Sequence, residues 1–345
     1  MNRLPFLLLI LLVIAGAAFV LDLGTGTVSI PPDQVLAILS GHGSEKQSWQ
    51  TIIMVFRLPK TIAACTAGAA LALSGLMMQT LFRNPLAGPS VLGISSGASM
   101  GVALVVLGTA ISSRGSRLVE GLGLGGNMML VAASAFGAFL VLLAILIAAR
   151  WVKDVMTLLI IGILGGFALS SVVSVLIHFS RPEMVQAYMA WTFGSFANIT
   201  WQEMKIFLPV LLAGIFSCLL VGKLLNGLLL GEDYARSMGL NYHSVRLVII
   251  SLTALLVGCV TAYCGPVGFI GIAVPHLARV VAGTSDHRSL LVVTALLGSV
   301  VAMVADIISQ LPGHASVLPL NAVTAMIGSP VIIWFIIKRQ RKIFV

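Results

Sequence analysis

The fold is decided by residues 57–101, which read RLPKTIAACTAGAALALSGLMMQTLFRNPLAGPSVLGISSGASMG. Two cations flank a proline at the start, and a run of apolar and small residues follows over 61–81. A polar break at 83–89 contains two prolines, which end one helix and set the start of the next. The second apolar run carries glycines at four-residue spacing, which lets helix backbones approach closely. The stretch therefore predicts a membrane hairpin of two helices joined by a tight polar turn.

The composition excludes a soluble globular protein. Of the 345 residues, 59% are hydrophobic and 9% are charged, whereas soluble domains carry about 25% charged residues. At roughly 20 residues for each span, the length accommodates roughly eight to eleven membrane helices. We therefore expect an all-α polytopic membrane protein that is surrounded by membrane lipid and forms one domain over residues 1–345.

The net charge of +9 is explained by topology. A basic chain can bind nucleic acid, but here the cations follow the expected loops. If both termini are cytoplasmic and the spans alternate, most of the 20 Lys and Arg residues fall on inner loops and helix ends. This is the distribution that the positive-inside rule describes. We therefore predict a multi-pass protein with both termini in the cytoplasm and no nucleic-acid partner.

Apolar runs predict about ten membrane helices. The first, 5–21, has small residues like those of a signal-peptide cleavage site, but it is long enough to span and counting it preserves the topology. A short surface helix is expected at 34–39, a polar outer segment at 180–200 and an inner loop at 224–246. After the hairpin, spans are expected at 127–149, 157–179, 201–223, 247–263, 269–283 and 290–308, with a last one that ends at 337.

The chain lacks the polar machinery of an enzyme or of a self-sufficient pump. The sequence has no phosphate-binding loop and no metal-type spacing of His, Cys or acidic residues, so we expect no cofactor. Ion-coupled transporters use ionisable relays deep in the membrane. Here the ionisable residues within predicted spans lie within about a turn or two of a span end, where snorkelling or capping accounts for them. They are His178, His276, Arg279 and Asp306.

The inner loop has the features of a short exposed helix. Residues 230–241 combine a helix-start signal with an amphipathic turn that ends at Gly239. Such a segment is either an ordinary connecting helix or an element that docks on a cytoplasmic partner.

Together these motifs resemble the permease subunits of type II ABC importers, the family that takes up iron-siderophores, haem and vitamin B12. The family's R-L-P-R, N-P-L-A and G-[VI]-S-x-G-A motifs correspond to 57–60, 84–87 and 93–98, and its P-H-x-x-R motif to 275–279. The resemblance implies a vitamin B12 importer permease-like fold in a bacterial inner membrane. It also implies a homodimer of permeases, two copies of a cytoplasmic ABC ATPase, and a periplasmic or lipid-anchored binding protein. Such a permease is not itself an enzyme.

The resemblance assigns residues to roles. The inner loop is similar to G-E-x-x-A-x-x-[LM]-G-[LV], the element that couples the permease to the ATPase. Asn84 and Leu86 match the turn that forms the cytoplasmic gate, and by position Val155 and Met156 would form its second layer. A hydrophobic constriction with amide groups seals against ions yet can widen for a large ligand. The implied coupling residues are Glu232, Ala235, Arg236, Met238, Gly239 and Leu240.

Arg57 and Lys60 match the outer cations that hold acidic residues of the binding protein. The alternative role for these two cations is to anchor the helix at the membrane interface. The family usually has a third cation where this chain has Gln310, which implies an altered docking surface.

The function that the resemblance implies is import of an iron chelate, either a siderophore or haem, by a permease subunit. Vitamin B12 or another corrinoid fits the same permease role, because specificity in this family resides largely in the binding protein. An ion-coupled secondary transporter that works through Asp306 or His276 is the alternative from another class.

Overall fold

The computed structural model describes residues 3–108, 126–152, 154–229, 237, 239, 241–310 and 317–341, and among these residues it contains helices and no strand. Seven helices of this described part are long and apolar enough to cross a membrane. Three further helices have shorter apolar stretches: α5 (Ile94–Val106), α14 (Ile270–Ala282) and α16 (Leu320–Arg341), which is apolar over Leu320–Phe335. The all-helical prediction is confirmed. The seven are α1 (Arg3–Gly24), the continuous helix Gln47–Leu81, α7 (Gly126–Trp151), α8 (Val155–His178), α10 (Trp201–Leu220), α13 (Tyr242–Cys264) and α15 (His287–Ser309).

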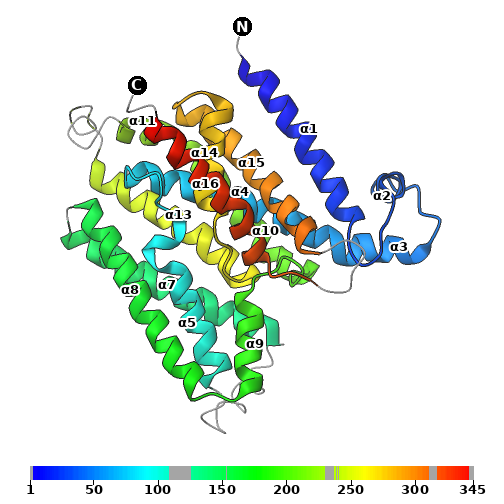
Figure 1. Ribbon diagram of the computed structural model, residues 1–345, viewed down its shortest axis with the longest axis horizontal. Coiled ribbons are helices and arrows are strands. Elements are labelled where there is room, and N and C mark those ends of the chain that lie inside the picture. The colour runs from blue at the N-terminus through cyan, green and yellow to red at the C-terminus, as the bar shows by residue number, and fades with distance from the viewer. Residues whose placement is uncertain are drawn as a thin grey trace.

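α4 (Leu58–Leu81) lies at the centre of the molecule, and most of its side chains are buried (Figure 1). It continues a helix that starts with α3 (Gln47–Thr51) and passes through a π-helix at Ile52–Arg57. Pro59 has no backbone N–H to donate, and the wider π turn before it accommodates the missing hydrogen bond. The helix therefore begins well before the predicted residue 61.

Small residues let the neighbours of α4 come into backbone contact. Gly68 faces Gly298 of α15, and a Cβ atom on either glycine would collide with the carbonyl oxygen of the other. A Cβ atom on Gly75 would likewise collide with the carbonyl oxygen of Gly271 of α14. Close backbone approach at small residues is a common basis of helix association in membranes. The small residues of the 61–81 run thus pack three helices together.

The predicted hairpin is wrong in its geometry. After α4 the chain passes through a 3₁₀ turn, η2 (Pro89–Leu92), and α5 then packs mainly on α7, α8 and α13, with hardly any contact to α4. The glycine stripe does support close packing, but with these other helices. Gly97 and Gly101 meet the backbone of α7 at Gly137 and Ala133. The turn redirects α5 because Gly93 adopts a left-handed backbone with φ of 76°.

The helices run between two ends of the molecule. Both chain termini lie toward the same end, which we call the terminal end (Figure 1). This end also carries the turn 82–88 after α4, the end of α7, the start of α8, and the short helix α11 (Gly222–Leu229), which bonds to the start of α15 (Figure 1). The opposite end carries α2 (Pro32–Leu39), α3 and α9 (Pro182–Thr192). Surface helix α2 agrees with the segment predicted at 34–39.

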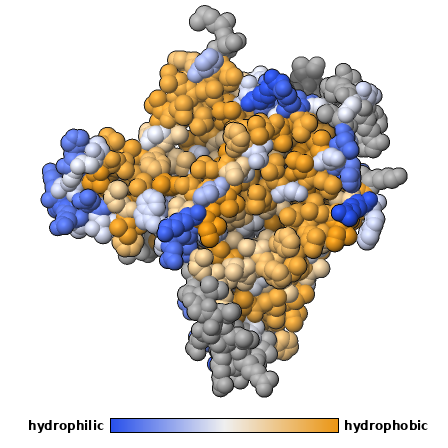
Figure 2. Space-filling view, turned by 180° about the vertical axis from the view of Figure 1, so that it is seen from behind, coloured by the Kyte–Doolittle hydropathy of each residue, from blue (hydrophilic) through white to orange (hydrophobic). Residues whose placement is uncertain are grey.

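The outer surface is apolar over broad areas, as expected for a protein in lipid. Figure 2 shows a face that is mostly hydrophobic, with hydrophilic residues gathered mainly at its margins. Large apolar side chains of α7 and α8 are exposed, among them Phe136, Phe139, Leu164 and Phe167. A soluble protein would not leave such a belt in water, so the surface supports the membrane assignment.

Candidate gate, coupling and docking sites

The turn after α4 is shaped by its own sequence. The Oδ1 atom of Asn84 accepts a hydrogen bond from the backbone N–H of Leu86 at 2.9 Å, and its carbonyl accepts one from Ala87 at 3.1 Å. An Asn side chain that bonds to the backbone two residues later is a common way to close a turn. These two hydrogen bonds shape the turn so that the side chain of Leu86 points outward, with 46% of the residue's surface exposed. The turn 82–88, called the gate turn below after its predicted role, thus presents an apolar side chain at its surface.

The second predicted gate layer lies beside this turn. Asp154 caps α8, because its carboxylate accepts hydrogen bonds from the backbone and hydroxyl of Thr157, both at 2.7 Å. These bonds lower the pKa of the Asp154 carboxyl from its ordinary value. Val155 and Met156 form the first turn of α8, and Met156 is exposed. A cavity of about 250 Å³ lies between the start of this turn and the start of α8. It is lined by Leu81, Phe82, Arg83, Asp154, Val155, Met156, Leu228 and Tyr242, and not by Asn84 or Leu86.

Most of the predicted coupling residues lie outside the described residues: Glu232, Ala235, Arg236, Met238 and Leu240. Gly239 is described, and its φ of 81° is a backbone conformation that favours glycine. The flanks of the loop are well defined. α11 precedes it, so the predicted loop start at 224 is wrong, and Asn241 caps α13 by accepting from Ser244 N at 3.2 Å. The coupling role itself stays a prediction.

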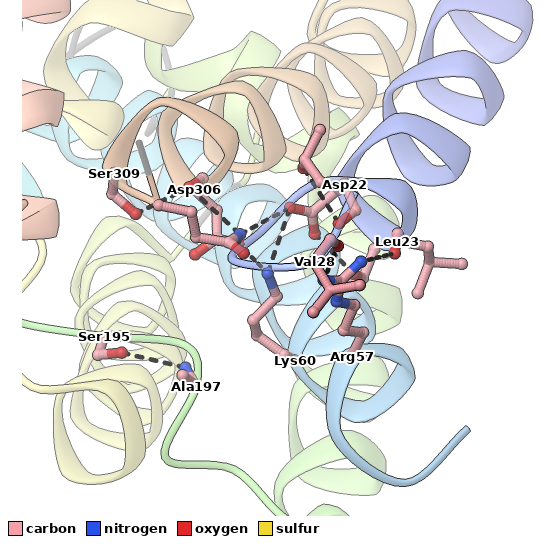
Figure 3. A network of polar contacts seen from close by, with 12 residues as sticks. Asp22, Leu23, Val28, Arg57, Lys60, Ser195, Ala197, Asp306 and Ser309 are labelled. Atoms are coloured by element: carbon pink, nitrogen blue, oxygen red, sulfur yellow. Dashed lines mark hydrogen bonds and ion pairs between the residues drawn. The ribbon is translucent and has the colours of Figure 1, made fainter. Parts of the chain in front are cut away.

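The two predicted docking cations lie in the interior of the chain. Lys60 is 6% exposed and Arg57 is 7% exposed. The Nζ atom of Lys60 lies 2.7 Å from Asp306 Oδ2 and 3.5 Å from Asp22 Oδ1 (Figure 3). Arg57 donates to the carbonyl oxygens of Leu23 at 2.8 Å and Val28 at 2.5 Å. To bind acidic residues of another protein, either cation would have to leave these partners, and their docking role stays a prediction.

Asp22 and Gln310 complete this network, and the sequence analysis assigned no role to Asp22. The side chain of Gln310 donates to Asp306 Oδ2 at 2.7 Å and to Asp22 Oδ1 at 3.4 Å. The hydroxyl of Thr61 donates to Asp22 Oδ2 at 2.6 Å. Two carboxylates, Asp22 and Asp306, therefore share one cation, Lys60, in a buried site, where charges need partners. The sequence pattern that could have identified Asp22 is a single acidic residue at the end of a long apolar run, since ionisable residues in such positions usually have a partner.

The other embedded ionisable residues also have protein partners. His276 is 1% exposed, and its Nε2 atom lies 2.7 Å from the carbonyl oxygen of Pro85 in the gate turn. Arg279 donates to Gln79 Oε1 at 2.7 Å. The expectation of snorkelling toward the membrane surface is therefore wrong for His276, Arg279 and Asp306, which bind neighbouring helices and turns. His178, in contrast, is exposed at the end of α8. Within the described part of the chain, no three His, Cys, Asp or Glu residues are grouped as a metal site.

Comparison with known proteins places this fold and these motifs in one family. Residues 9–338 match the FecCD transport family. The chain belongs to this family. Among its relatives, the vitamin B12 import system permease protein BtuC of Klebsiella pneumoniae is 36% identical to this FecCD-family chain over 323 residues. That alignment covers 93% of this chain and 90% of the relative. BtuC of Escherichia coli O9:H4 is 35% identical over 292 residues, with 85% of each chain covered.

Solved structures show the same architecture. A chain described as part of a metal-chelate type ABC transporter in an inward-facing conformation superposes on this FecCD-family chain with a TM-score of 0.83 and 28% identity. The match covers 97% of this chain and 99% of the other. PsaBC from Streptococcus pneumoniae, in complex with a Fab, matches with a TM-score of 0.52 and 17% identity, over 88% of this chain and 94% of the other. At that identity the second match concerns the fold alone.

Proposed function

We propose that this chain is the permease subunit of a type II ABC importer that moves an iron chelate or a corrinoid across the inner membrane. The observation that carries the proposal is the correspondence, over nearly the full length of both chains, with a permease-like chain of a metal-chelate type ABC transporter. The relatives named as vitamin B12 permeases make a corrinoid as good a candidate as a siderophore or haem.

The terminal end is the cytoplasmic end. It carries the gate turn, the start of α8, and α11 and α13, which flank the predicted coupling loop at residues 230–240. The seven long apolar helices among the described residues, together with α5, α14 and α16, would make ten membrane-crossing segments, an even number that would leave both termini on one side. α5 and α14 have 13 residues each, which at about 1.5 Å per residue is shorter than the hydrocarbon core. They cross as part of the protein interior rather than as free-standing spans.

Two copies of the chain form the pathway, with α8 and the gate turn facing the centre. Leu86 and Met156 are exposed in the single chain although both are apolar, and α8 leaves Leu164 and Phe167 uncovered. A second copy would cover these side chains and close the two gate layers against each other. Docking of two ATPase copies on the coupling loops would drive gate opening, and a binding protein would deliver the substrate at the opposite end, over Arg57 and Lys60.

The proposal is tested by purifying the chain from its native membrane in mild detergent and identifying the co-purifying proteins by mass spectrometry. We expect an ABC ATPase in equal amount and a substrate-binding protein in the same complex. Uptake by cells that lack and regain the chain is then compared for an iron-loaded siderophore, haem and cyanocobalamin. A chain that purifies alone and accumulates solute on an ion gradient would contradict the proposal and favour a secondary transporter.

A further inference from the structure

Two polar links connect the flanks of the coupling loop, residues 230–240, to the two gate layers. The first link starts at α11, which precedes the loop. Asn226 of α11 donates from Nδ2 to Asp286 Oδ1 at 2.6 Å, and its Oδ1 accepts from the backbone N–H of His287 at 2.8 Å. These bonds fix Asn226 against the start of α15.

The ring of His287 continues this link to α4. Its Nδ1 lies 2.9 Å from Asn226 Oδ1, and its Nε2 lies 2.8 Å from the hydroxyl oxygen of Thr80. His287 is 2% exposed and Thr80 is similarly buried. Thr80 lies on the last turn of α4, directly before the gate turn that holds Asn84 and Leu86. Since Asn226 Oδ1 can only accept, Nδ1 is the donor and Nε2 the acceptor. The Thr80 hydroxyl therefore donates to Nε2 in preference to its other acceptor, the carbonyl of Leu76. A shift of α11 relative to α4 would then break one of these bonds.

The second link starts at α13, which follows the loop. Arg246 is 3% exposed, and it donates from Nη1 to the carbonyl oxygen of Val152 at 3.1 Å and from Nη2 to that of Ala149. The last carbonyls of a helix have no partner within the helix, and the helix dipole favours a cation there. Arg246 therefore holds the end of α7 and the turn that leads into Val155 and Met156.

We infer that the coupling loop moves the two gate layers separately through these links. Asn226, His287 and Thr80 transmit its motion to Asn84 and Leu86, and Arg246 transmits it to Val155 and Met156. The inference rests on the proposed function and adds the residues that carry the coupling. Hydrogen bonds suit this task because each one holds its donor and acceptor at a narrow range of distance and angle.

The test uses two reporter variants, Leu86→Cys and Met156→Cys, in the full complex reconstituted with its ATPase. The rate at which a membrane-impermeant thiol reagent labels each reporter is measured with and without ATP. The parent chain provides the background, because Cys218 and Cys264 are buried and Cys65 and Cys259 are partly so. We expect ATP to change labelling at both reporters about fivefold or more, the lower end of usual allosteric coupling.

Breaking one link should abolish the ATP-dependent change in labelling at one reporter only. Thr80→Val keeps the shape of the side chain and removes the hydroxyl, so the ATP response should be lost at position 86 and kept at 156. Arg246→Gln should do the reverse. Thr80→Ser and Arg246→Lys should restore part of each response. Ser74→Ala is the matched control, because Ser74 is also buried on α4 but its hydroxyl bonds to the carbonyl of Ala70 in the same helix.

The outcomes separate this inference from the proposed function. If neither reporter responds to ATP in the absence of link mutations, the gate assignment within the proposed function fails. If both respond, but Thr80→Val behaves as Ser74→Ala does, the first link is wrong. If either Thr80→Val or Arg246→Gln abolished the ATP response at both reporters, the two gate layers would share one coupling route. That result would overturn the inference of separate links. His287→Asn keeps a nitrogen near the Nδ1 position and loses the bond to Thr80, so it replaces Thr80→Val should that variant not fold.

Discussion

Lys60 joins three helices at the opposite end of the molecule. It comes from α4 and binds Asp22 of α1 and Asp306 of α15, while Gln310 bridges the two carboxylates. A buried ion pair of this kind adds little stability relative to an apolar replacement of the whole cluster. Removing one partner is different, because the remaining charges are then left unpaired in the interior. The network therefore fixes how the three helices meet.

Lys60→Met should destabilise the protein by about 3–5 kcal/mol, because it leaves two buried carboxylates without their cation. The triple variant Asp22→Asn, Lys60→Met, Asp306→Asn should recover most of this loss, since no charge then remains unpaired. Thermal unfolding of the purified chain in detergent measures both effects. Lys205→Met, at an exposed position of α10, is the control. Equal stability of Lys60→Met and Lys205→Met would show that the network is not intact.

Sequence reasoning identified Arg57 and Lys60 as important cations but not their burial. Asp22 lies 38 residues before Lys60, and Gln310 lies 288 residues after Asp22. Periodicity along the chain reports which residues are apolar, but it does not report which helix ends meet. The partners of Lys60 became visible only when α1, α4 and α15 were brought together in space.

At the scale of elements, the helix types follow from the sequence but their partners do not. The apolar runs correctly placed the long helices, and the glycines at 93, 97 and 101 correctly indicated close packing. The predicted hairpin was wrong because glycine spacing shows that one face of a helix allows close approach, but it does not show which other helix packs on that face. Likewise α11 was expected within a loop, although its buried Leu225 and Leu228 mark an amphipathic helix.

Gly68→Ala should weaken the packing of α4 on α15, because the added methyl group collides with the backbone at Gly298 and the helices must move apart. Overpacking of this kind costs about 1–3 kcal/mol. Gly16→Ala is the matched control, since a Cβ atom at this position of α1 meets nothing within 4 Å. The two variants are compared by their thermal unfolding midpoints in detergent. A midpoint for Gly68→Ala as high as that of Gly16→Ala would contradict the backbone contact.

In the whole molecule, the gate turn and the start of α8 lie close together, although they are about 70 residues apart in the sequence. Membrane helices of about 20 residues separate them along the chain. The family resemblance predicted both layers, and one cavity at the terminal end is lined by Val155 and Met156 together with Phe82 and Arg83 of the turn. The resemblance did not indicate that His276 binds the turn through the carbonyl of Pro85. This contact depends on the meeting of α14 with the turn after α4, which no local pattern records.

The double variant Asn84→Ala, Leu86→Ala should make the resting pathway leaky. Alanine at 84 removes the bond that closes the turn, and alanine at 86 removes the apolar side chain that would seal the constriction. Efflux of a trapped dye from proteoliposomes without ATP measures the leak. Leu212→Ala, at an exposed apolar position of α10, provides the comparison for loss of a surface leucine. A leak no greater than that of Leu212→Ala would remove these residues from the gate.

The central claim is tested most directly by reconstituting the chain with its ATPase and binding protein in proteoliposomes and following uptake of radiolabelled iron chelate or cobalamin. We expect uptake that requires ATP inside the vesicles and persists when proton and sodium gradients are collapsed by ionophores. Uptake that continues without the ATPase, and stops when the ion gradients are collapsed, would contradict that claim.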